Sequence, residues 1–287
     1  MAESVPPPSG VYRLTSIARP VDPHYPTNRA LLAVLALIAV ASAGLSGLLG
    51  LDGGLLRIAL TSMLVGFAAW AVTRELAPDD NAAAFLALAL AWLAFLFCGA
   101  DSVLLAFVVL VLVRVVNRST GLPARPLDTL AVVGLSAWAA VSLEQHLVLV
   151  LAAAAFSLDA TLYKPQHHHF LAAFVCIAAF GWLNATGQLY TPASLTLLDW
   201  SAAAALAAAN LWVIARSGEP ASVSDVYAER LNGSRVRAGL LLGYLLAFQA
   251  LITDGHDAWL ETPLWVCLFA VPVSLLARRL LFARSGD

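Results

Sequence analysis

Ten long apolar segments constrain this chain more than any other feature of its sequence. A helix that crosses the hydrocarbon core of a bilayer needs about 20 mostly apolar residues, with roughly 17 as a lower limit. Short polar breaks separate the segments, which cover residues 30–51, 56–73, 82–99, 102–117, 128–143, 146–162, 168–184, 195–215, 238–253 and 263–281. The chain is 61% hydrophobic and 12% charged, which is far more apolar than a soluble domain of this length. The sequence therefore predicts an all-α, polytopic integral membrane protein, a bundle of about ten transmembrane helices arranged as hairpins.

The basic residues predict how this bundle is oriented. If successive segments alternate in direction, all of the 16 lysine and arginine residues except Arg57 fall on one side of the membrane. Cytoplasmic loops carry an excess of lysine and arginine, so we expect this side, and with it both termini, to be cytoplasmic. The expected location is the plasma membrane, that is, the inner membrane of a bacterium. The net charge of −2 gives no indication of nucleic-acid binding.

The chain divides into three predicted parts. Residues 1–29 form a polar, proline-rich cytoplasmic tail without regular structure, residues 30–281 form the transmembrane domain, and residues 282–287 form a short cytoplasmic tail. The alternative for the first segment is cleavage after Ala41-Ser42-Ala43, which matches a signal-peptidase site. The long leader before it and the apolar run that continues through Leu51 favour retention of this segment as a membrane span.

The loop at residues 216–237 is the longest connection between segments. In its sequence "SVSDVYAERLNG", Ser222 or Ser224 is predicted to cap a short amphipathic helix that ends at Asn232-Gly233. Apart from the lipid bilayer itself, this loop is the part of the chain expected to offer a surface to a partner protein.

The stretch "YKPQHHHF" contains the chain's one lysine, Lys164, followed by His167, His168 and His169. Neighbouring residues of a helix point about 100° apart, whereas helical metal sites usually place their ligands at i and i+4. Cationic and aromatic side chains are also typical of span ends at the headgroup layer. We therefore interpret these residues as a cytoplasmic rim, with a metal-binding or ligand-binding loop as the alternative.

Two turns on the predicted outer side carry a second group of polar residues. Glu144 and His146 lie in one turn, and Asp254, His256 and Asp257 lie in another. Imidazoles and carboxylates are ligands for zinc, manganese or iron, so Glu144, His146, His256 and Asp257 are candidate metal ligands if the two turns meet. The alternative is that they are ordinary solvated turn residues. No cofactor motif is evident elsewhere in the chain.

Asp159 is the one acidic residue expected at the depth of the inner leaflet, because the sixth segment is too short to span unless it continues to about Tyr163. An ionisable side chain within a membrane span is a candidate functional residue. The alternative is a headgroup-level residue that forms an ion pair with Arg125 or Lys164. Asp128, at the start of the fifth segment, is expected near it.

Three functions remain open on this basis. The first is a secondary transporter or permease, with Glu144, His146, Asp254, His256 and Asp257 at its outer mouth and Asp159 nearer the cytoplasm. The second is a membrane-embedded enzyme that acts on a lipid or isoprenoid, and the third is a non-catalytic membrane component of a larger assembly. The sequence disfavours an enzyme, because the predicted spans contain few residues that could act as an acid or a base.

Overall fold

The protein is all-α in the computed structural model, which describes residues 10–51, 53–99, 103–186 and 192–284. The described residues form two 3₁₀ helices, η1 (Gly10–Arg13) and η2 (Gly255–Leu260), and ten α-helices. The α-helices are α1 (Pro26–Leu49), α2 (Leu55–Leu76), α3 (Asn81–Cys98), α4 (Leu104–Asn117), α5 (Pro126–Ser142), α6 (Leu147–Thr161), α7 (His169–Ala185), α8 (Leu197–Arg216), α9 (Gly233–Asp254) and α10 (Thr262–Arg284). Each predicted segment corresponds to one helix, so the all-α class and the ten helices are confirmed.

Six of these helices are long and apolar enough to cross a membrane: α1, α2, α3, α8, α9 together with η2, and α10. The apolar helices α4 to α7 are shorter, with 14, 17, 15 and 17 residues. At about 1.5 Å per residue, α4 rises roughly 21 Å, which is less than the roughly 30 Å of bilayer hydrocarbon. The long helices support a multi-pass membrane protein, and the crossing of the membrane by α4 to α7 stays a prediction.

Local sequence signals explain several helix ends. Proline is the first residue of α1 and of α5, where its missing N–H group needs no partner. The side chain of Asp80 accepts a hydrogen bond from the amide of Ala83 and so caps α3, and Asn232 caps α9 in the same way. Thr196 and Asp199 form a capping box at the start of α8.

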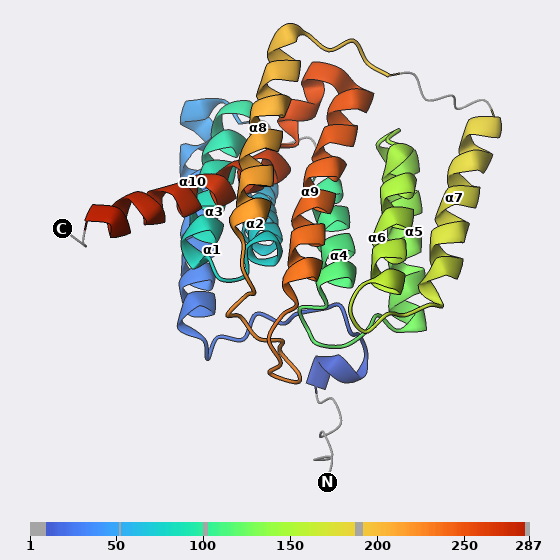
Figure 1. The fold of residues 1–287 in the computed structure, drawn as a ribbon. Coiled ribbons are helices and arrows are strands. Elements are labelled where there is room, and N and C mark those ends of the chain that lie inside the picture. The colour runs from blue at the N-terminus through green and yellow to red at the C-terminus, as the bar shows by residue number, and fades with distance from the viewer. Residues whose placement is uncertain (1–9, 52, 100–102, 187–191, 285–287) are drawn as a thin grey trace.

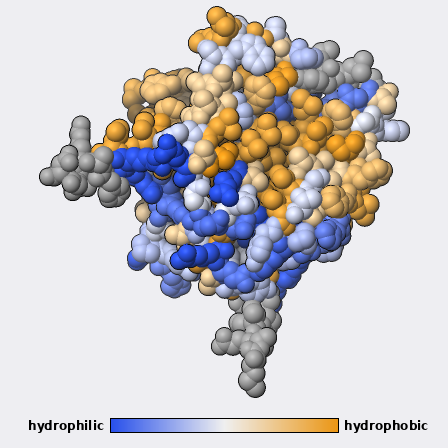
Figure 2. Space-filling view, viewed as in Figure 1, coloured by the Kyte–Doolittle hydropathy of each residue, from blue (hydrophilic) through white to orange (hydrophobic). Residues whose placement is uncertain are grey.

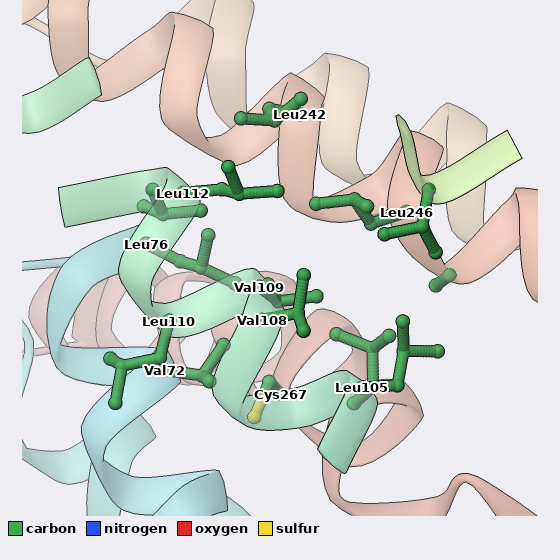
Figure 3. Packing of buried hydrophobic residues seen from close by; sticks show 14 of the residues in the cluster. Val72, Leu76, Leu105, Val108, Val109, Leu110, Leu112, Leu242, Leu246 and Cys267 are labelled. Carbon is green, nitrogen blue, oxygen red and sulfur yellow. The ribbon is translucent and has the colours of Figure 1, made fainter. Parts of the chain in front are cut away.

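The helices pack around α4, most of whose side chains are buried. In Figure 3, Leu105, Val109 and Leu112 of α4 lie among apolar side chains of α2, α9 and α10. Figure 1 shows α5, α6 and α7 side by side on one flank of the bundle, and α1 and α3 on the other. α4 and α9 lie between these two groups, and both contact α6.

The two ends of the bundle differ in polarity. Figure 2 shows a broad hydrophobic band over the helices and hydrophilic surface at the end where the N-terminal segment lies. We call this the basic end, because the α2–α3, α4–α5, α6–α7 and α8–α9 connections gather there (Figure 1), and most of the arginines and Lys164 lie in or next to these connections. The opposite end, which carries Arg57, Glu144 and Asp257, is called the acidic end.

The N-terminal segment is packed against the basic end instead of forming a free tail. Apart from η1, its described residues before α1 have no regular helix, as predicted, but Ser16 and Ile17 are buried. The amide and hydroxyl of Ser16 donate hydrogen bonds to Asp128 at 2.8 and 2.6 Å, and Thr120 donates to the Ser16 carbonyl at 2.6 Å. The predicted boundary at residue 29 is also late, because α1 begins at Pro26. Residues 1–9 and 285–287 lie outside the described residues.

The predicted amphipathic helix in loop 216–237 is wrong. Between the end of α8 and the start of α9 the chain forms turns and one isolated antiparallel bridge between Val223 and Arg230. Asp79, in the α2–α3 turn, accepts hydrogen bonds from the amides of Ala221 and Ser222, so these groups are bound across the molecule instead of within a helix. The left-handed φ of 51° at Ala228 would also end a helical turn.

Candidate functional site

A fully buried carboxylate, Asp159, lies near the C-terminal end of α6 at the basic end of the bundle. It accepts two hydrogen bonds from Arg118, from Nε at 2.7 Å and from Nη2 at 2.8 Å. Arg235 Nη1 lies 2.7 Å from Oδ1, and His169 Nδ1 lies 2.7 Å from Oδ2. We call Asp159, Arg118, Arg235 and His169 the basic-end cluster. It is a buried network of one carboxylate, two guanidinium groups and one imidazole.

Four helices position this cluster. Arg118 is the C-cap of α4 and has a left-handed φ of 52°, which turns its side chain back towards α6. Arg235 lies in the first turn of α9, and His169 is the first residue of α7. The cluster therefore depends on the relative placement of α4, α6, α7 and α9, which a single sequence does not show.

N–H groups of Arg118 and Arg235 also donate hydrogen bonds to backbone carbonyls. Arg235 donates to the carbonyls of Val116 at 2.7 Å and of Tyr163 at 2.6 and 3.0 Å. Arg118 donates to the Lys164 carbonyl at 2.7 Å. These carbonyls lie at or just beyond the C-terminal ends of α4 and α6, where the helix leaves acceptors unpaired and the macrodipole favours cations. The same two arginines therefore neutralise Asp159 and cap two helices.

The prediction that Asp159 forms an ion pair with Arg125 or Lys164 is wrong, because its partners are Arg118 and Arg235. Lys164 lies on the surface and pairs with Glu229 at 2.7 Å, and Arg125 donates to backbone carbonyls of the N-terminal segment. Asp128 is bound to Ser16 instead of joining the cluster.

The three consecutive histidines are in different environments. His167 and His168 are exposed, whereas His169 is fully buried and forms part of the basic-end cluster. The Nε2 atom of His169 lies 3.1 Å from the hydroxyl of Thr129 in α5, so both ring nitrogens have partners. Partial desolvation, together with the neighbouring His169, lowers the pKa of His168. The buried position of His169 was missed because only its alignment with Asp159 across the α6–α7 turn distinguishes it from its neighbours.

At the acidic end, the two polar turns meet through a residue that the sequence did not single out. Gln145, between Glu144 and His146, is buried and donates a hydrogen bond through Nε2 to Asp254 at the end of α9. The amide of Gln249 donates to Gln145 Oε1 at 2.8 Å. We call Gln145, Gln249 and Asp254 the acidic-end cluster. It links the α5–α6 turn to the last turns of α9.

The remaining predicted residues at this end are arranged differently. Glu144 and Asp257 are exposed, and the Nδ1 atom of the buried His146 has no hydrogen-bond partner within the described structure. His256 Nδ1 lies 3.0 Å from Asp199, in the first turn of α8, and Asp199 also accepts a bond from Trp259 Nε1 at 2.9 Å. No group of three or more histidine, cysteine or acidic side chains that could hold a metal ion occurs among the described residues.

The two clusters lie at opposite ends of one helix–helix seam. Arg235 and Gln249 are 14 residues apart on α9, which is two heptads, so both lie on the same face of that helix. Asp159 lies two residues before the end of α6 at the basic end, and Gln145 precedes α6 at the acidic end. The buried side chains along α6 between them are small or apolar, including Ala152 and Phe156. Polar contacts therefore close the α6–α9 seam at its two ends, and apolar packing fills its middle.

A second buried network joins the N-terminal segment to the bundle. The carboxylate of Glu75, 1% exposed at the end of α2, lies 2.9 Å from Arg114 and 3.1 Å from Arg19. Arg19 also forms two hydrogen bonds of 2.7 Å with Asp225 in the α8–α9 loop. Burial, with a further contribution from Asp225, raises the pKa of Tyr12 to about 12. Sequence reasoning missed Glu75, because an acidic residue at a span end is ordinarily solvated.

These features define a multi-pass helical membrane protein whose buried charges lie near the ends of its helices. No known family model, curated protein or solved structure matches this chain.

Proposed function

We propose that the protein is a secondary transporter in which α5, α6 and α7 move as a unit against α4 and α9. The observation that carries this proposal is the pair of polar clusters at opposite ends of the α6–α9 seam. Alternating access requires that a pathway open at one end while it is closed at the other. Breaking one cluster while keeping the other gives that arrangement.

The packing of α5, α6 and α7 favours movement as one body. α7 contacts α5 and α6. At the basic end, His169 of α7 contacts both Asp159 of α6 and Thr129 of α5, and so connects the three helices. Within lipid, apolar side chains gain little by facing each other instead of the acyl chains, so helix association depends on close packing and interhelical hydrogen bonds. The polar clusters therefore carry much of the attachment of this unit to α4 and α9.

The proposed orientation places the basic end in the cytoplasm of a bacterial cell, because the arginines other than Arg57 and the one lysine gather there. In this arrangement Asp159 closes the cytoplasmic end of the pathway, and Asp254 closes its outer end. His256 and Asp257, on the outer rim, are proposed to meet the solute first. Buried charges of this kind within membrane proteins commonly belong to ion or substrate pathways.

The competing proposal is a non-catalytic component of a larger assembly, with the α8–α9 loop as its contact surface. It is favoured by the apolar middle of the seam, where a transporter needs polar groups for its solute. The third possibility, a membrane-embedded enzyme, depended on the histidines and carboxylates of the outer turns. Their positions in the structure provide no observation that favours it.

Cysteine accessibility tests the transporter proposal without knowledge of the solute. Ala152→Cys places a reporter on α6 seven residues before Asp159, in a background in which Cys98, Cys176 and Cys267 are replaced by alanine. The protein is reconstituted in liposomes, and a membrane-impermeant thiol reagent is applied from each side in turn. We expect Asp159→Asn to speed modification from the basic end, and Gln145→Ala to speed it from the acidic end. A shift of 1.4 kcal/mol in the opening equilibrium corresponds to a tenfold change in rate.

The control is Asp225→Asn, which removes a carboxylate from the basic end without touching the seam. It should leave both rates unchanged. If both seam variants elute as a single folded species but the reporter stays unreactive, or if each variant opens both ends equally, the two-ended gate does not exist. The assembly proposal then takes its place.

A further inference from the structure

A pocket of about 250 Å³ lies at the basic end, away from the α6–α9 seam. The C-terminal end of α8, the N-terminal end of α9, the middle of α10 and the α2–α3 turn line it. Its inner wall is apolar and formed by buried side chains, Val213 of α8, Val236 of α9 and Val271 of α10. The pocket therefore has a hydrophobic back and a polar rim.

Three arginines and three carboxylates form the rim: Arg216, Arg237, Arg278, Asp79, Asp80 and Glu219. The charges sum to nearly zero, and they are not paired off completely within the pocket. Asp80 lies 3.3 Å from Arg278, and Asp79 is satisfied by two loop amides.

Two cationic groups and one carboxylate remain available on this rim. Arg237 donates only to neutral oxygens, including the Ser217 carbonyl at 3.1 Å, and the exposed Arg216 forms no ion pair among the described residues. Glu219 accepts a hydrogen bond from the Gly233 amide at 2.9 Å through one oxygen and is otherwise exposed. The rim therefore offers a doubly cationic site close to an anionic one.

The part of α10 that follows the pocket has the pattern of a helix at a membrane surface. After Pro272, a residue that interrupts helical hydrogen bonding, the last part of α10 leaves the bundle (Figure 1). Leu276, Leu280 and Leu281 are 50–66% exposed there, beside Arg278 and Arg279. Exposed leucines next to arginines are typical of a helix in the interfacial layer. Figure 2 shows hydrophilic surface adjoining the hydrophobic band in this region.

We propose that this pocket binds a zwitterionic phospholipid whose headgroup carries a phosphate and a primary ammonium group. The phosphate lies between the guanidinium groups of Arg216 and Arg237, since arginine matches phosphate oxygens with pairs of N–H donors. The ammonium group donates to Glu219, and the acyl chains run along the apolar wall. A purely anionic lipid gains from the arginines but leaves Glu219 without a cation. This inference is independent of the proposed transport activity.

Native mass spectrometry of the full chain in mild detergent tests the proposal. The protein is mixed with equal amounts of phosphatidylethanolamine, phosphatidylglycerol and phosphatidylcholine. We expect phosphatidylethanolamine to be retained preferentially, since the quaternary ammonium of phosphatidylcholine cannot donate a hydrogen bond. Arg216→Ala/Arg237→Ala should reduce retention at least tenfold. Arg29→Ala/Arg230→Ala, which removes the same charge from exposed positions outside the pocket, should not.

The variant Glu219→Gln separates the two halves of the headgroup. It keeps an oxygen for the Gly233 amide, so α9 stays capped, but it removes the negative charge. We expect retention to persist while the preference shifts from phosphatidylethanolamine towards phosphatidylglycerol. Unchanged preference in this variant, equal retention of the three lipids by the wild type, or unchanged retention in the double arginine variant would overturn the proposal.

Discussion

Replacement of Asp159 by asparagine should be among the most damaging single changes at the basic end. The variant Asp159→Asn keeps the size of the side chain and one acceptor oxygen but removes its charge. The guanidinium groups of Arg118 and Arg235, 9% and 3% exposed, then lose the carboxylate that neutralises them. Two cations are left buried side by side without their counter-ion.

The expected loss of stability follows from this burial. Removal of one partner from a buried ion pair typically costs about 3–5 kcal/mol, because the other charge stays desolvated. Both arginines keep hydrogen bonds to backbone carbonyls at the ends of α4 and α6, and these bonds retain part of their stabilisation. We therefore expect a loss near the lower limit, about 3 kcal/mol in the free energy of unfolding.

Equilibrium unfolding in mixed micelles with increasing sodium dodecyl sulfate, followed by the fluorescence of the 8 tryptophans, measures this loss. The matched control is Glu229→Gln, which breaks the pair with Lys164 at the same end. These side chains are 60% and 54% exposed, so the change should stay within about 1 kcal/mol. A loss of less than about 1 kcal/mol for Asp159→Asn would show that the cluster is hydrated or adaptable, and the argument from buried charge would fail.

Three further predictions follow from other parts of the structure. Burial alone would raise the pKa of Asp79, but hydrogen bonds from the α8–α9 loop outweigh this and hold it below the ordinary value. The stability that Asp79 contributes to the folded protein is fully present above the pKa of this group in the unfolded chain. It is lost as the pH falls through the lowered pKa of Asp79 in the folded protein. Hydrogen exchange of the loop amides, corrected for intrinsic rates, should therefore rise in acid, and Asp79→Asn should abolish that pH dependence. Gly239→Ala should destabilise the fold by about 1–3 kcal/mol, because the new Cβ would lie 2.3 Å from Asn117 Oδ1. The control Gly134→Ala, which meets open space, should be neutral or stabilising by up to about 1 kcal/mol, and an equal loss for both would contradict the packing argument. Finally, Cys98 is exposed near the acidic end of α3, so a membrane-impermeant maleimide should label it from outside intact cells, and labelling only after lysis would reverse the proposed orientation.

The helices could be predicted from the sequence because a membrane span must be apolar along its whole length. The predicted and observed segments differ mostly by a few residues, with the largest difference at the start of α9, where Arg235 and Arg237 made the first turn look like loop. Those arginines belong to the helix because its packing supplies them with partners. A hydropathy pattern does not show which residues will become partners of a charged side chain in the fold.

The α8–α9 loop shows why the polar parts were harder to predict. Serine, asparagine and glycine are signals for helix caps and for turns alike. Asp79 decides between these outcomes by binding two loop amides, from a position more than 140 residues earlier in the chain. The docking of the N-terminal segment depends in the same way on Asp128, 112 residues from Ser16. Local sequence signals do not contain these distant contacts.

The place of Asp159 within the sixth helix could be predicted from the length of its apolar segment, and in the structure this carboxylate is fully buried. A lone carboxylate there would be expensive, so the fold brings cations to it from α4 and α9, and an imidazole from α7. Each added partner ties another helix to the same point. In the proposed transporter, this cluster holds the seam closed while it is complete and weakens when Asp159 is neutralised, because the two guanidinium groups then repel each other. An apolar contact of the same size has no such state, which is why a buried charge network at one end of the seam and a polar cluster at the other favour the proposed movement over a fixed scaffold.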